Sequence, residues 1–232
     1  MNHFSYGNTK PYRVAVCMWY DKPIQEYANI AYKINKKYCD SHGYDLLYSN
    51  KRLLPQRHPA WERFPMMLDV LNTNNYDYVL WIDADACFVK HSKLRLDDIL
   101  EHHNDKDILF SSDNNSNENI PINTGVMILK NTQYSRQFLA KVIYSDHIEQ
   151  CRSRFKKRLW EQDCVTHFFN TDDELREKSV VIDYGILQLF SSDYVDDSGV
   201  SPLVYHFMSL PNSERLEKLE FFMTYGLILE TK

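Results

Sequence analysis

The stretch YVLWIDADACFV, residues 78–89, places two aspartates one residue apart directly after a run of apolar side chains. An ionised carboxylate beside a protein core is costly unless it meets a cation, backbone donors or water. In an extended segment, side chains two residues apart point to the same side, so Asp83 and Asp85 would present both carboxylates to one point while Ala84 faces the other way. This arrangement suits a hard divalent cation, and open α/β sheets bind ligands at such strand ends.

Strand-like and helix-like patterns alternate along the chain, which is typical of an α/β fold. Residues 12–20 form a β-rich run, Tyr27, Ile30 and Ile34 then recur at helical spacing, and His42-Gly43 predicts the end of that helix. Further predicted strands cover residues 44–49, 76–82, 107–112, 121–131, 179–184 and 202–207. Further predicted helices cover residues 61–71, 96–103, 132–149, 159–169 and 212–225. Because no linker or repeat divides the chain, we expect a single domain over residues 1–232.

Composition and charge narrow the function classes. The 232 residues are 44% hydrophobic and 25% charged, which is ordinary for a globular protein and argues against disorder. A net charge of -5 without a long Lys/Arg tract argues against nucleic-acid binding. The local basic cluster CRSRFKKRLW, residues 151–160, fits a solvated helix face, with an anionic ligand as the alternative.

The cysteines and the apolar runs bear on location. Five cysteines lack regular spacing, and Cys17 and Cys87 fall inside predicted strands, so we expect buried reduced thiols in a reducing compartment and no disulfide framework. No apolar run approaches the roughly 20 residues that cross a bilayer, so no membrane span is expected. The chain reads as a soluble, cytoplasmic protein, unless a longer natural product has been trimmed.

Three interpretations of the Asp-x-Asp triplet are open. Oxygen ligands fit Mg²⁺ or Mn²⁺, and an added imidazole would favour Mn²⁺. Alternatively, Asp83 and Asp85 cap backbone amides in a turn. A third interpretation is aspartyl-phosphate chemistry with Asp83 as the nucleophile, although Ala86 and Cys87 stand where such motifs usually carry Thr or Val.

Four segments together resemble the nucleotide-sugar-dependent glycosyltransferases of the GT-A fold. The resemblance is to the galactosyltransferase and glycogenin-like families, which include yeast-type α-galactosyl and mannosyl enzymes. The segments are AWERFPMMLDVL, YDYVLWIDADACF, INTGVMILKN with WEQDCVTHFF, and VYHFMS, and they follow the family order over residues 12–210. The resemblance implies a single Rossmann-like GT-A domain with a central mixed, mostly parallel sheet flanked by helices.

In such enzymes the two carboxylates and a late histidine hold a manganese ion that also binds the donor's diphosphate. The matching residues here are Asp83, Asp85 and His206, with Mg²⁺ as the alternative metal. The role makes chemical sense because a divalent cation stabilises the charge on a departing nucleoside diphosphate. The alternative for His206 is an ordinary core histidine.

The resemblance also implies residues that contact the donor. Arg63 and Asn123 match residues that reach the sugar or phosphate, Gly125 permits close backbone approach, and Ala84 lies between the two acids. The alternative for Arg63 is a surface salt bridge. The end of the first strand would border the nucleoside base, which points to the residues Cys17, Met18, Trp19 and Tyr20.

The segment EQD at residues 161–163 matches an acid-Gln-Asp motif that faces the reactive carbon of the sugar. Glu161 and Gln162 are therefore the expected residues that orient the donor and stabilise an oxocarbenium-like transition state, with Asp163 beside them. The alternative is an exposed helix start. The resemblance favours retention of configuration, whereas an inverting enzyme would need a carboxylate base such as Asp163 or Asp183.

One departure from the family pattern concerns the diphosphate. The late His-Phe motif usually continues to a glycine and a lysine, but Ser209 replaces the glycine and no lysine follows at the expected place. Arg215 or Lys218 are candidates to replace that lysine.

The expected activity is metal-dependent transfer of a hexose-type sugar from a nucleotide diphosphate donor, most plausibly a UDP-sugar, to a hydroxyl of a glycan or glycoprotein. The acceptor pocket would be built by loops at residues 50–60, 111–120 and 185–201. Two alternatives from other classes are a phosphatase or phosphotransferase that uses Asp83, and a non-catalytic sugar-nucleotide-binding module.

Overall fold

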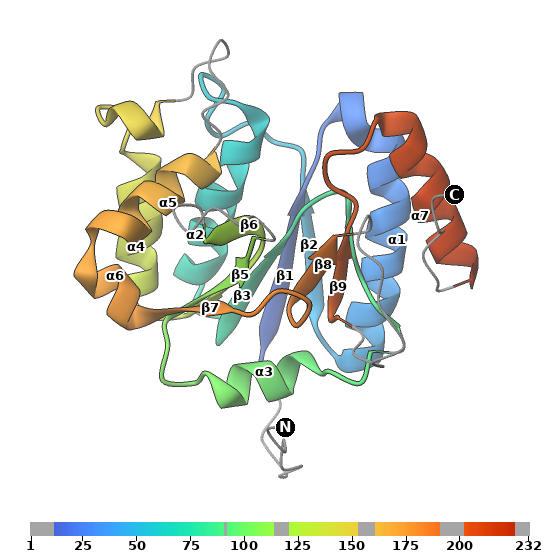
Figure 1. Ribbon diagram of the computed structural model, residues 1–232, viewed down its shortest axis with the longest axis horizontal. Coiled ribbons are helices and arrows are strands. Elements are labelled where there is room, and N and C mark those ends of the chain that lie inside the picture. Colours follow the sequence, from blue (N-terminus) through green and yellow to red (C-terminus); the bar gives the residue numbers. More distant parts are fainter. Residues whose placement is uncertain (1–11, 91, 114–120, 153–160, 191–201, 226–232) are drawn as a thin grey trace.

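The protein folds around a six-stranded mixed sheet with helices on both faces (Figure 1). The computed structural model describes residues 12–90, 92–113, 121–152, 161–190 and 202–225. The strand order is β2-β1-β3-β6-β5-β7. These strands are β1 Val14–Trp19, β2 Asp45–Ser49, β3 Tyr78–Ile82, β5 Ile108–Ser112, β6 Ile122–Lys130 and β7 Ser179–Ile182. The predicted α/β class is confirmed, and the sheet is mixed with a parallel majority because only the pairs that involve β6 are antiparallel.

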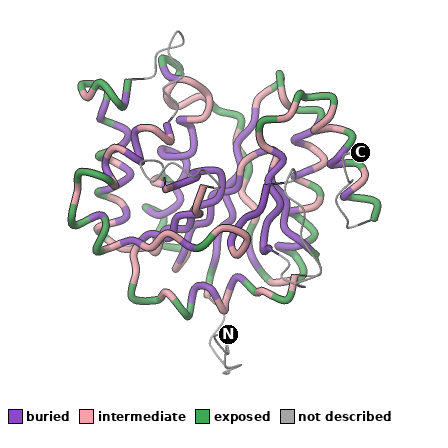
Figure 2. Tube along the Cα trace, viewed as in Figure 1, coloured by how far each residue is buried: buried purple, intermediate pink, exposed green. Residues whose placement is uncertain are grey.

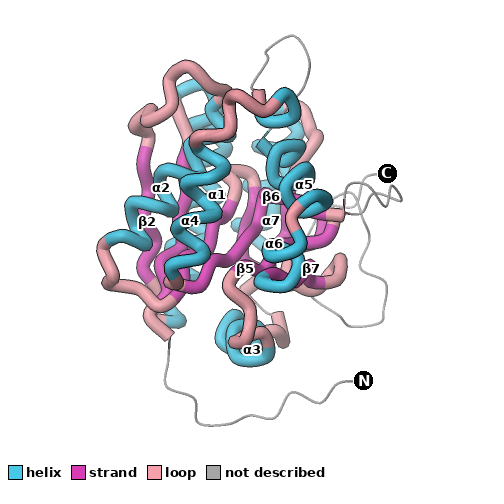
Figure 3. Tube along the Cα trace, turned by 90° about the vertical axis from the view of Figure 1, so that its left-hand side faces the viewer, coloured by secondary structure: helices cyan, strands magenta, loops and turns pink. Residues whose placement is uncertain are grey.

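The helices form two layers that bury the two faces of this sheet. The helices are α1 Gln25–His42, α2 Arg63–Asn72, α3 Leu96–His102, α4 Gln133–Ile143, α5 Glu161–Thr171, α6 Asp173–Lys178 and α7 Asn212–Tyr225. Helices α1 and α7 lie on one side of the sheet, and α2, α4, α5 and α6 lie on the other (Figure 1). Figure 3 shows α3 apart from both layers, below the sheet.

Strand β1 shows why the central strands read as continuous apolar runs. Its alternate residues Val14, Val16 and Met18 belong to the core beneath α1, whereas Cys17 and Trp19 belong to the core beneath α2. Because both faces of a central strand are covered, every position needs an apolar side chain. The buried centre of the molecule therefore follows the sheet (Figure 2).

A second, three-stranded sheet was not predicted. It has the order β4-β9-β8, with the strands β4 Ala86–Phe88, β8 Gln188–Phe190 and β9 Val204–His206. Each strand has only three residues; β9 lies within the strand predicted at 202–207, whereas β8 lies in a segment that was predicted as a loop. Strand β9 pairs antiparallel with β4 and parallel with β8, so it joins the segment after the Asp-x-Asp triplet to the C-terminal part of the chain.

Most predicted helix bounds agree with the structure. Gly43 ends α1 with a positive φ of 73°, and its N–H donates to the carbonyl of Cys39, as the His42-Gly43 signal predicts. The C-terminal helix spans the expected residues. The helix predicted at 132–149 ends at Ile143, because Ser145 begins a hydrogen-bonded turn that closes from Ile148 N–H to the Ser145 carbonyl. Most of the basic cluster at 151–160 lies outside the described residues, and the single domain over 1–232 stays a prediction.

The cysteine prediction is wrong for one pair. Cys151 and Cys164 form a disulfide across a sequence separation of 13 residues, whereas Cys17, Cys39 and Cys87 are free and buried. The pair meets because the short helix η3 Glu149–Cys151 packs against α5, a tertiary contact that cysteine spacing does not reveal. Since disulfides persist mainly in oxidising compartments, the cysteine argument for a reducing compartment no longer stands, and a cytoplasmic location stays a prediction. Among the described residues, no helix combines the length and apolar character that crossing a bilayer requires.

Candidate active site

The two aspartates lie in a tight turn between two strands and not in an extended segment. Strand β3 ends at Ile82, and β4 begins at Ala86, whose N–H donates to the carbonyl of Asp83 at 3.0 Å. The N–H of Asp83 donates to the carbonyl of Gly125 on β6 at 2.9 Å. The turn brings both carboxylates to one side, so the predicted convergence occurs through a different backbone geometry.

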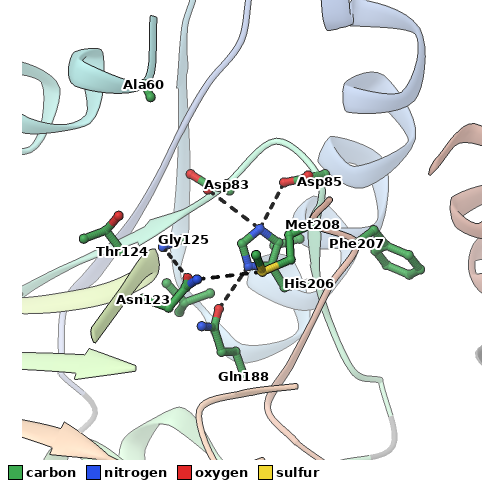
Figure 4. A network of polar contacts seen from close by, with 12 residues as sticks. Ala60, Asp83, Asp85, Asn123, Thr124, Gly125, Gln188, His206, Phe207 and Met208 are labelled. Carbon is green, nitrogen blue, oxygen red and sulfur yellow. Dashed lines mark hydrogen bonds and ion pairs between the residues drawn. The ribbon is translucent and has the colours of Figure 1, made fainter. Parts of the chain in front are cut away.

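The third predicted ligand, His206, reaches the aspartates through the second sheet. The antiparallel pairing of β4 and β9 sets Ala86 opposite His206. His206 Nε2 lies 3.2 Å from Asp85 Oδ1 and 3.7 Å from Asp83 Oδ2 (Figure 4). The ligand atoms of these three residues lie within 4.8 Å of one another, and we call them the Asp-Asp-His cluster. The ring of His206 is buried, as the alternative of an ordinary core histidine predicts. Its Nε2 nevertheless faces two carboxylates, which that alternative does not predict.

Two arginines compensate the charge of the cluster. Arg63 Nη2 lies 3.0 Å from Asp83 Oδ1 and 2.9 Å from Glu161 Oε1. Its Nη1 also donates to the carbonyl of Thr124. Arg63 is only 4% exposed, so the surface salt-bridge alternative is wrong: the bridge exists but is buried. Arg63 therefore ties the end of β3 to the start of α5.

Arg215 on α7 binds the other aspartate. Its Nε lies 3.0 Å from Asp85 Oδ2, and its guanidinium lies over the ring of Tyr27. Ser209, which replaces the glycine of the family pattern, has a φ of 60°, so the left-handed backbone that favours glycine is kept. Lys218 is buried beside Glu214 and does not line the cleft described below. Of the two candidate cations, the structure brings Arg215 to the cluster.

The charged groups of the cluster shift one another's ionisation. Burial raises the pKa of Asp83 above its ordinary value, against the pull of Arg63. Burial also disfavours ionised Asp85, but the His206 ring and Arg215 hold the pKa of Asp85 below its ordinary value. Burial disfavours charged His206, yet the charge of Asp85 raises the pKa of that imidazole overall. Because Asp85 raises the pKa of His206, a proton on the imidazole and a cation would compete for the same place beside the carboxylates.

The EQD segment forms the first turn of α5 and faces β6. Thr124 connects the first two residues: its hydroxyl donates to Glu161 Oε1 and its N–H donates to Gln162 Oε1, each at 3.2 Å. Gln162 Nε2 also donates to Asp113 Oδ2 at 3.1 Å. Glu161 is only 3% exposed, so the exposed-helix alternative is wrong for it. Asp163 lines the cleft next to Gln162.

Asn123 and Gly125 lie beside the cluster on β6. Asn123 Oδ1 accepts from the Gly125 N–H at 2.9 Å, and Asn123 Nδ2 lies 3.8 Å from Met208 Sδ (Figure 4). A Cβ atom on Gly125 would meet His206 Cε1 at 2.2 Å. Glycine at position 125 therefore makes room for the His206 ring, which lies against its backbone.

The four residues proposed at the end of the first strand have different positions. Trp19 lines the cleft and donates from Nε1 to the carbonyl of Lys51. Cys17 and Met18 are fully buried in the two opposite cores. Tyr20 is buried against Tyr48. The structure thus brings only Trp19 of these four to the cleft.

Sequence reasoning missed Gln188. Its Oε1 lies 3.1 Å from His206 Nδ1, on the side of the ring that faces away from the carboxylates (Figure 4). The available signal is a single polar residue within the apolar run Ile186-Leu187-Gln188-Leu189-Phe190. A polar side chain at a buried strand position needs a partner, so this run predicts one for Gln188.

The Asp-Asp-His cluster, both arginines and the start of α5 border one cleft of about 760 Å³. This volume lies within the range of about 300 to 1,000 Å³ that small-molecule sites occupy. The residues at its wall come from both layers of helices and both sheets, and include Trp19, Tyr27, Ala84, Gln162, His206 and Arg215. The cleft therefore lies where the Asp-x-Asp turn, the start of α5 and the start of α7 meet.

The fold is of the GT-A class, a mixed sheet flanked by helices, and an Asp-x-Asp turn lies at the end of a central strand. A glycosyltransferase involved in the glycosylation of the major capsid of PBCV-1 has a similar crystal structure, with a TM-score of 0.73 and 16% identity over 90% of this chain and 99% of that chain. The chain belongs to the family described as "Protein of unknown function, DUF273", which matches residues 35–184.

Two curated relatives are plant enzymes. Galactomannan galactosyltransferase 1 of Cyamopsis tetragonoloba is 25% identical over 177 residues, which is 67% of this chain and 40% of that protein. Xyloglucan 6-xylosyltransferase 4 of Arabidopsis thaliana is 29% identical over 134 residues, which is 51% of this chain and 24% of that protein. This chain thus spans less than half the length of either relative. These homologues and the structural neighbour are named glycosyltransferases, which confirms the resemblance seen in the sequence.

Proposed function

We propose that the protein is a metal-dependent glycosyltransferase that moves a hexose-type sugar from a nucleoside diphosphate donor to a hydroxyl of a glycan or glycoprotein. The observation that carries this proposal is the convergence of Asp83, Asp85 and His206 within 4.8 Å at the wall of the cleft. These residues come from two distant parts of the chain. The names of the relatives, a galactosyltransferase and a xylosyltransferase, support a sugar as the transferred group.

The residues present fit a divalent cation. Two carboxylates and one imidazole are a suitable donor set for Mn²⁺, with Mg²⁺ as the alternative. Asp83 and Asp85 keep 22% and 14% of their side chains exposed, so an ion can reach them from the cleft. A cation bound there supplies Lewis-acid stabilisation of the charge on a departing diphosphate.

The two arginines supply positive charge from the protein itself. Arg215 lies at the cleft wall, where its Nη2 can donate to a phosphate oxygen while Nε binds Asp85 and Nη1 binds Asn212. We therefore assign it the role of the missing lysine. Arg63 is fixed by four protein contacts, so its role is to hold Asp83 and Glu161 in place.

The start of α5 is proposed to face the donor sugar. Glu161 and Gln162 are oriented by Thr124, and preorganised groups of this kind stabilise charge that develops in a transition state. Retention of configuration stays our proposal. For an inverting reaction, Asp163 lines the cleft and is the better base candidate, because Asp183 is exposed and does not line it.

The geometry favours sugar transfer over aspartyl-phosphate chemistry. A nucleophilic Asp83 would need an unhindered carboxylate oxygen. Its Oδ1 accepts from Trp81 Nε1 at 2.7 Å and pairs with Arg63, and its Oδ2 faces His206. A phosphatase would hydrolyse simple phosphate esters and form an adduct at Asp83, and a binding module would show no turnover.

The test is a thermal-shift panel of nucleotide sugars with and without Mn²⁺, followed by a sugar-transfer assay. A ligand that binds only the folded state at 100 times its Kd adds about 2.7 kcal/mol, or roughly 5 to 10 °C for a chain of this size. We expect this shift only with a UDP-sugar and Mn²⁺ together. Equal shifts without metal, or no shift with any nucleotide, would refute the proposal.

A pair of variants controls for unspecific effects of removing an acid. Asp85→Ala should abolish the metal-dependent shift, because Asp85 belongs to the Asp-Asp-His cluster. Asp69→Ala removes an exposed carboxylate on α2 that does not line the cleft, so it should keep the shift. Loss of the shift in both variants would count against a specific site.

A further inference from the structure

The ring of His206 is held from the side opposite to the two carboxylates. His206 Nδ1 lies 3.1 Å from Gln188 Oε1, while Nε2 lies 3.2 Å from Asp85 Oδ1. Both Gln188 and His206 are almost fully buried. The two nitrogens of the ring therefore meet different surroundings, one an amide oxygen and the other a pair of acids.

The backbone of β8 fixes Gln188 in this position. Strand β8 pairs parallel with β9, so that Gln188 lies opposite Val204 and Phe190 lies opposite His206. The carbonyl of Gln188 accepts from the Gly185 N–H at 2.9 Å. Phe190, two residues further along the same face of β8, contacts the His206 ring edge-on with centroids 6.0 Å apart.

The donor and acceptor roles follow from this contact. An amide oxygen only accepts hydrogen bonds, so Nδ1 must carry the proton that it shares with Gln188. Nε2 faces Asp83 and Asp85, so in the neutral, metal-free ring Asp85 and the Gln188 oxygen compete for the single proton, and a cation between the two acids would leave that proton on Nδ1. The amide nitrogen of Gln188 has no hydrogen-bond partner among the described residues, so the observed contact is made by the oxygen alone.

We propose that Gln188 is a positioning residue that fixes the tautomer and orientation of His206, so that Nε2 is the nitrogen offered to a cation. This inference rests on the proposed function, in which His206 binds a metal ion. A histidine that binds a metal through one ring nitrogen almost always donates from the other nitrogen to an acceptor. Gly125 contributes the space: any larger residue there would collide with the ring that Gln188 orients.

The first test reads the tautomer directly. Long-range nitrogen-15 spectra of the metal-free protein, at a pH where the ring is neutral, should show a proton on Nδ1 of His206, with its signals identified by their loss in His206→Gln. In Gln188→Met the chain length is similar but the acceptor is gone, so the Nδ1–H preference should weaken. A wild-type ring protonated on Nε2 would overturn the proposal, and so would an unchanged preference in Gln188→Met.

The second test measures Mn²⁺ affinity by titration calorimetry. Gln188→Met should weaken binding by about 10- to 100-fold, as removal of such partners typically does. Gln188→Glu keeps an acceptor and should bind no more weakly than wild type. Gln137→Met, an exposed glutamine on α4, is the matched control and should bind as wild type does. Equal affinity of wild type and Gln188→Met would refute the proposal.

The two tests separate this inference from the proposed function. Wild-type protein that binds no Mn²⁺ would refute the metal-dependent function, whereas the His206 spectra would still decide the role of Gln188. If Gln188→Met fails to fold in the metal-free state, the wild-type spectra and the affinity of Gln188→Glu decide instead. Weak binding by a folded Gln188→Glu variant would contradict the proposed role of the acceptor.

Discussion

Replacing Gly125 by alanine should damage the Asp-Asp-His cluster with a single methyl group. The added Cβ would lie 2.2 Å from His206 Cε1, 2.7 Å from Nδ1 and 2.9 Å from Asn123 Oδ1. Ordinary contact begins near 3.4 Å, so the ring must move by about 1.2 Å. The backbone cannot yield instead, because the Gly125 N–H binds Asn123 and its carbonyl binds Asp83.

The expected effects are on both metal affinity and stability. A metal site tolerates errors of about 0.2 Å in ligand position, so a displaced imidazole is lost as a ligand. We expect Mn²⁺ affinity to fall by about 10- to 100-fold. Overpacking of this kind also costs about 1 to 3 kcal/mol of unfolding free energy. Calorimetric titration and urea unfolding of the metal-free protein measure the two quantities separately.

Gly43→Ala is the matched control. Gly43 has a φ of 73° and nothing within 4 Å of an added Cβ, so the substitution strains the end of α1 without touching the cleft. It should cost about 1 to 2 kcal/mol of stability and leave Mn²⁺ affinity unchanged. Wild-type Mn²⁺ affinity in Gly125→Ala would refute the reasoning, and equal losses in both variants would show that affinity merely follows stability.

Three further predictions concern the disulfide, the buried arginine and pH. Reduction of the Cys151–Cys164 disulfide, or replacement of both cysteines by serine, should lower the unfolding free energy by about 3 kcal/mol. This is the entropic value for closing a loop of 13 residues, and urea unfolding with and without reductant measures it. Arg63→Ala should cost about 3 to 5 kcal/mol because it leaves the buried Glu161 carboxylate and the partly buried Asp83 carboxylate without their cation, so an unfolding midpoint equal to wild type would contradict the assignment. Burial disfavours charged His206, but Asp85 raises the pKa of that ring in the metal-free protein, so protons compete with the cation and Mn²⁺ affinity should fall on acidification. Affinity that stays constant or rises as the buffer becomes acidic would contradict this.

The strands and helices of the main sheet are readable because their patterns are long. The run at 78–82 is apolar at every position, and its length and context identify a central strand. The second sheet was not predicted as a sheet: β9 lies within the strand expected at 202–207, but three-residue strands have no period that would reveal their pairing. That sheet determines the position of His206, so its meeting with the aspartates was predictable only through resemblance to other proteins. Contacts made across layers, such as the disulfide and the bond from Gln188 to His206, depend on packing that spacing along the chain does not encode.

The pairing of β4 with β9 limits where the chain can gain or lose residues. Ala86 lies opposite His206 in this short ladder, so the position of the imidazole depends on local register and not on the length of the chain between the strands. Additions or deletions in the intervening surface loops leave the ladder intact. One residue inserted within 204–206, however, would turn the imidazole to the opposite side of its strand. Tolerance to changes in length should therefore end abruptly at these six paired positions.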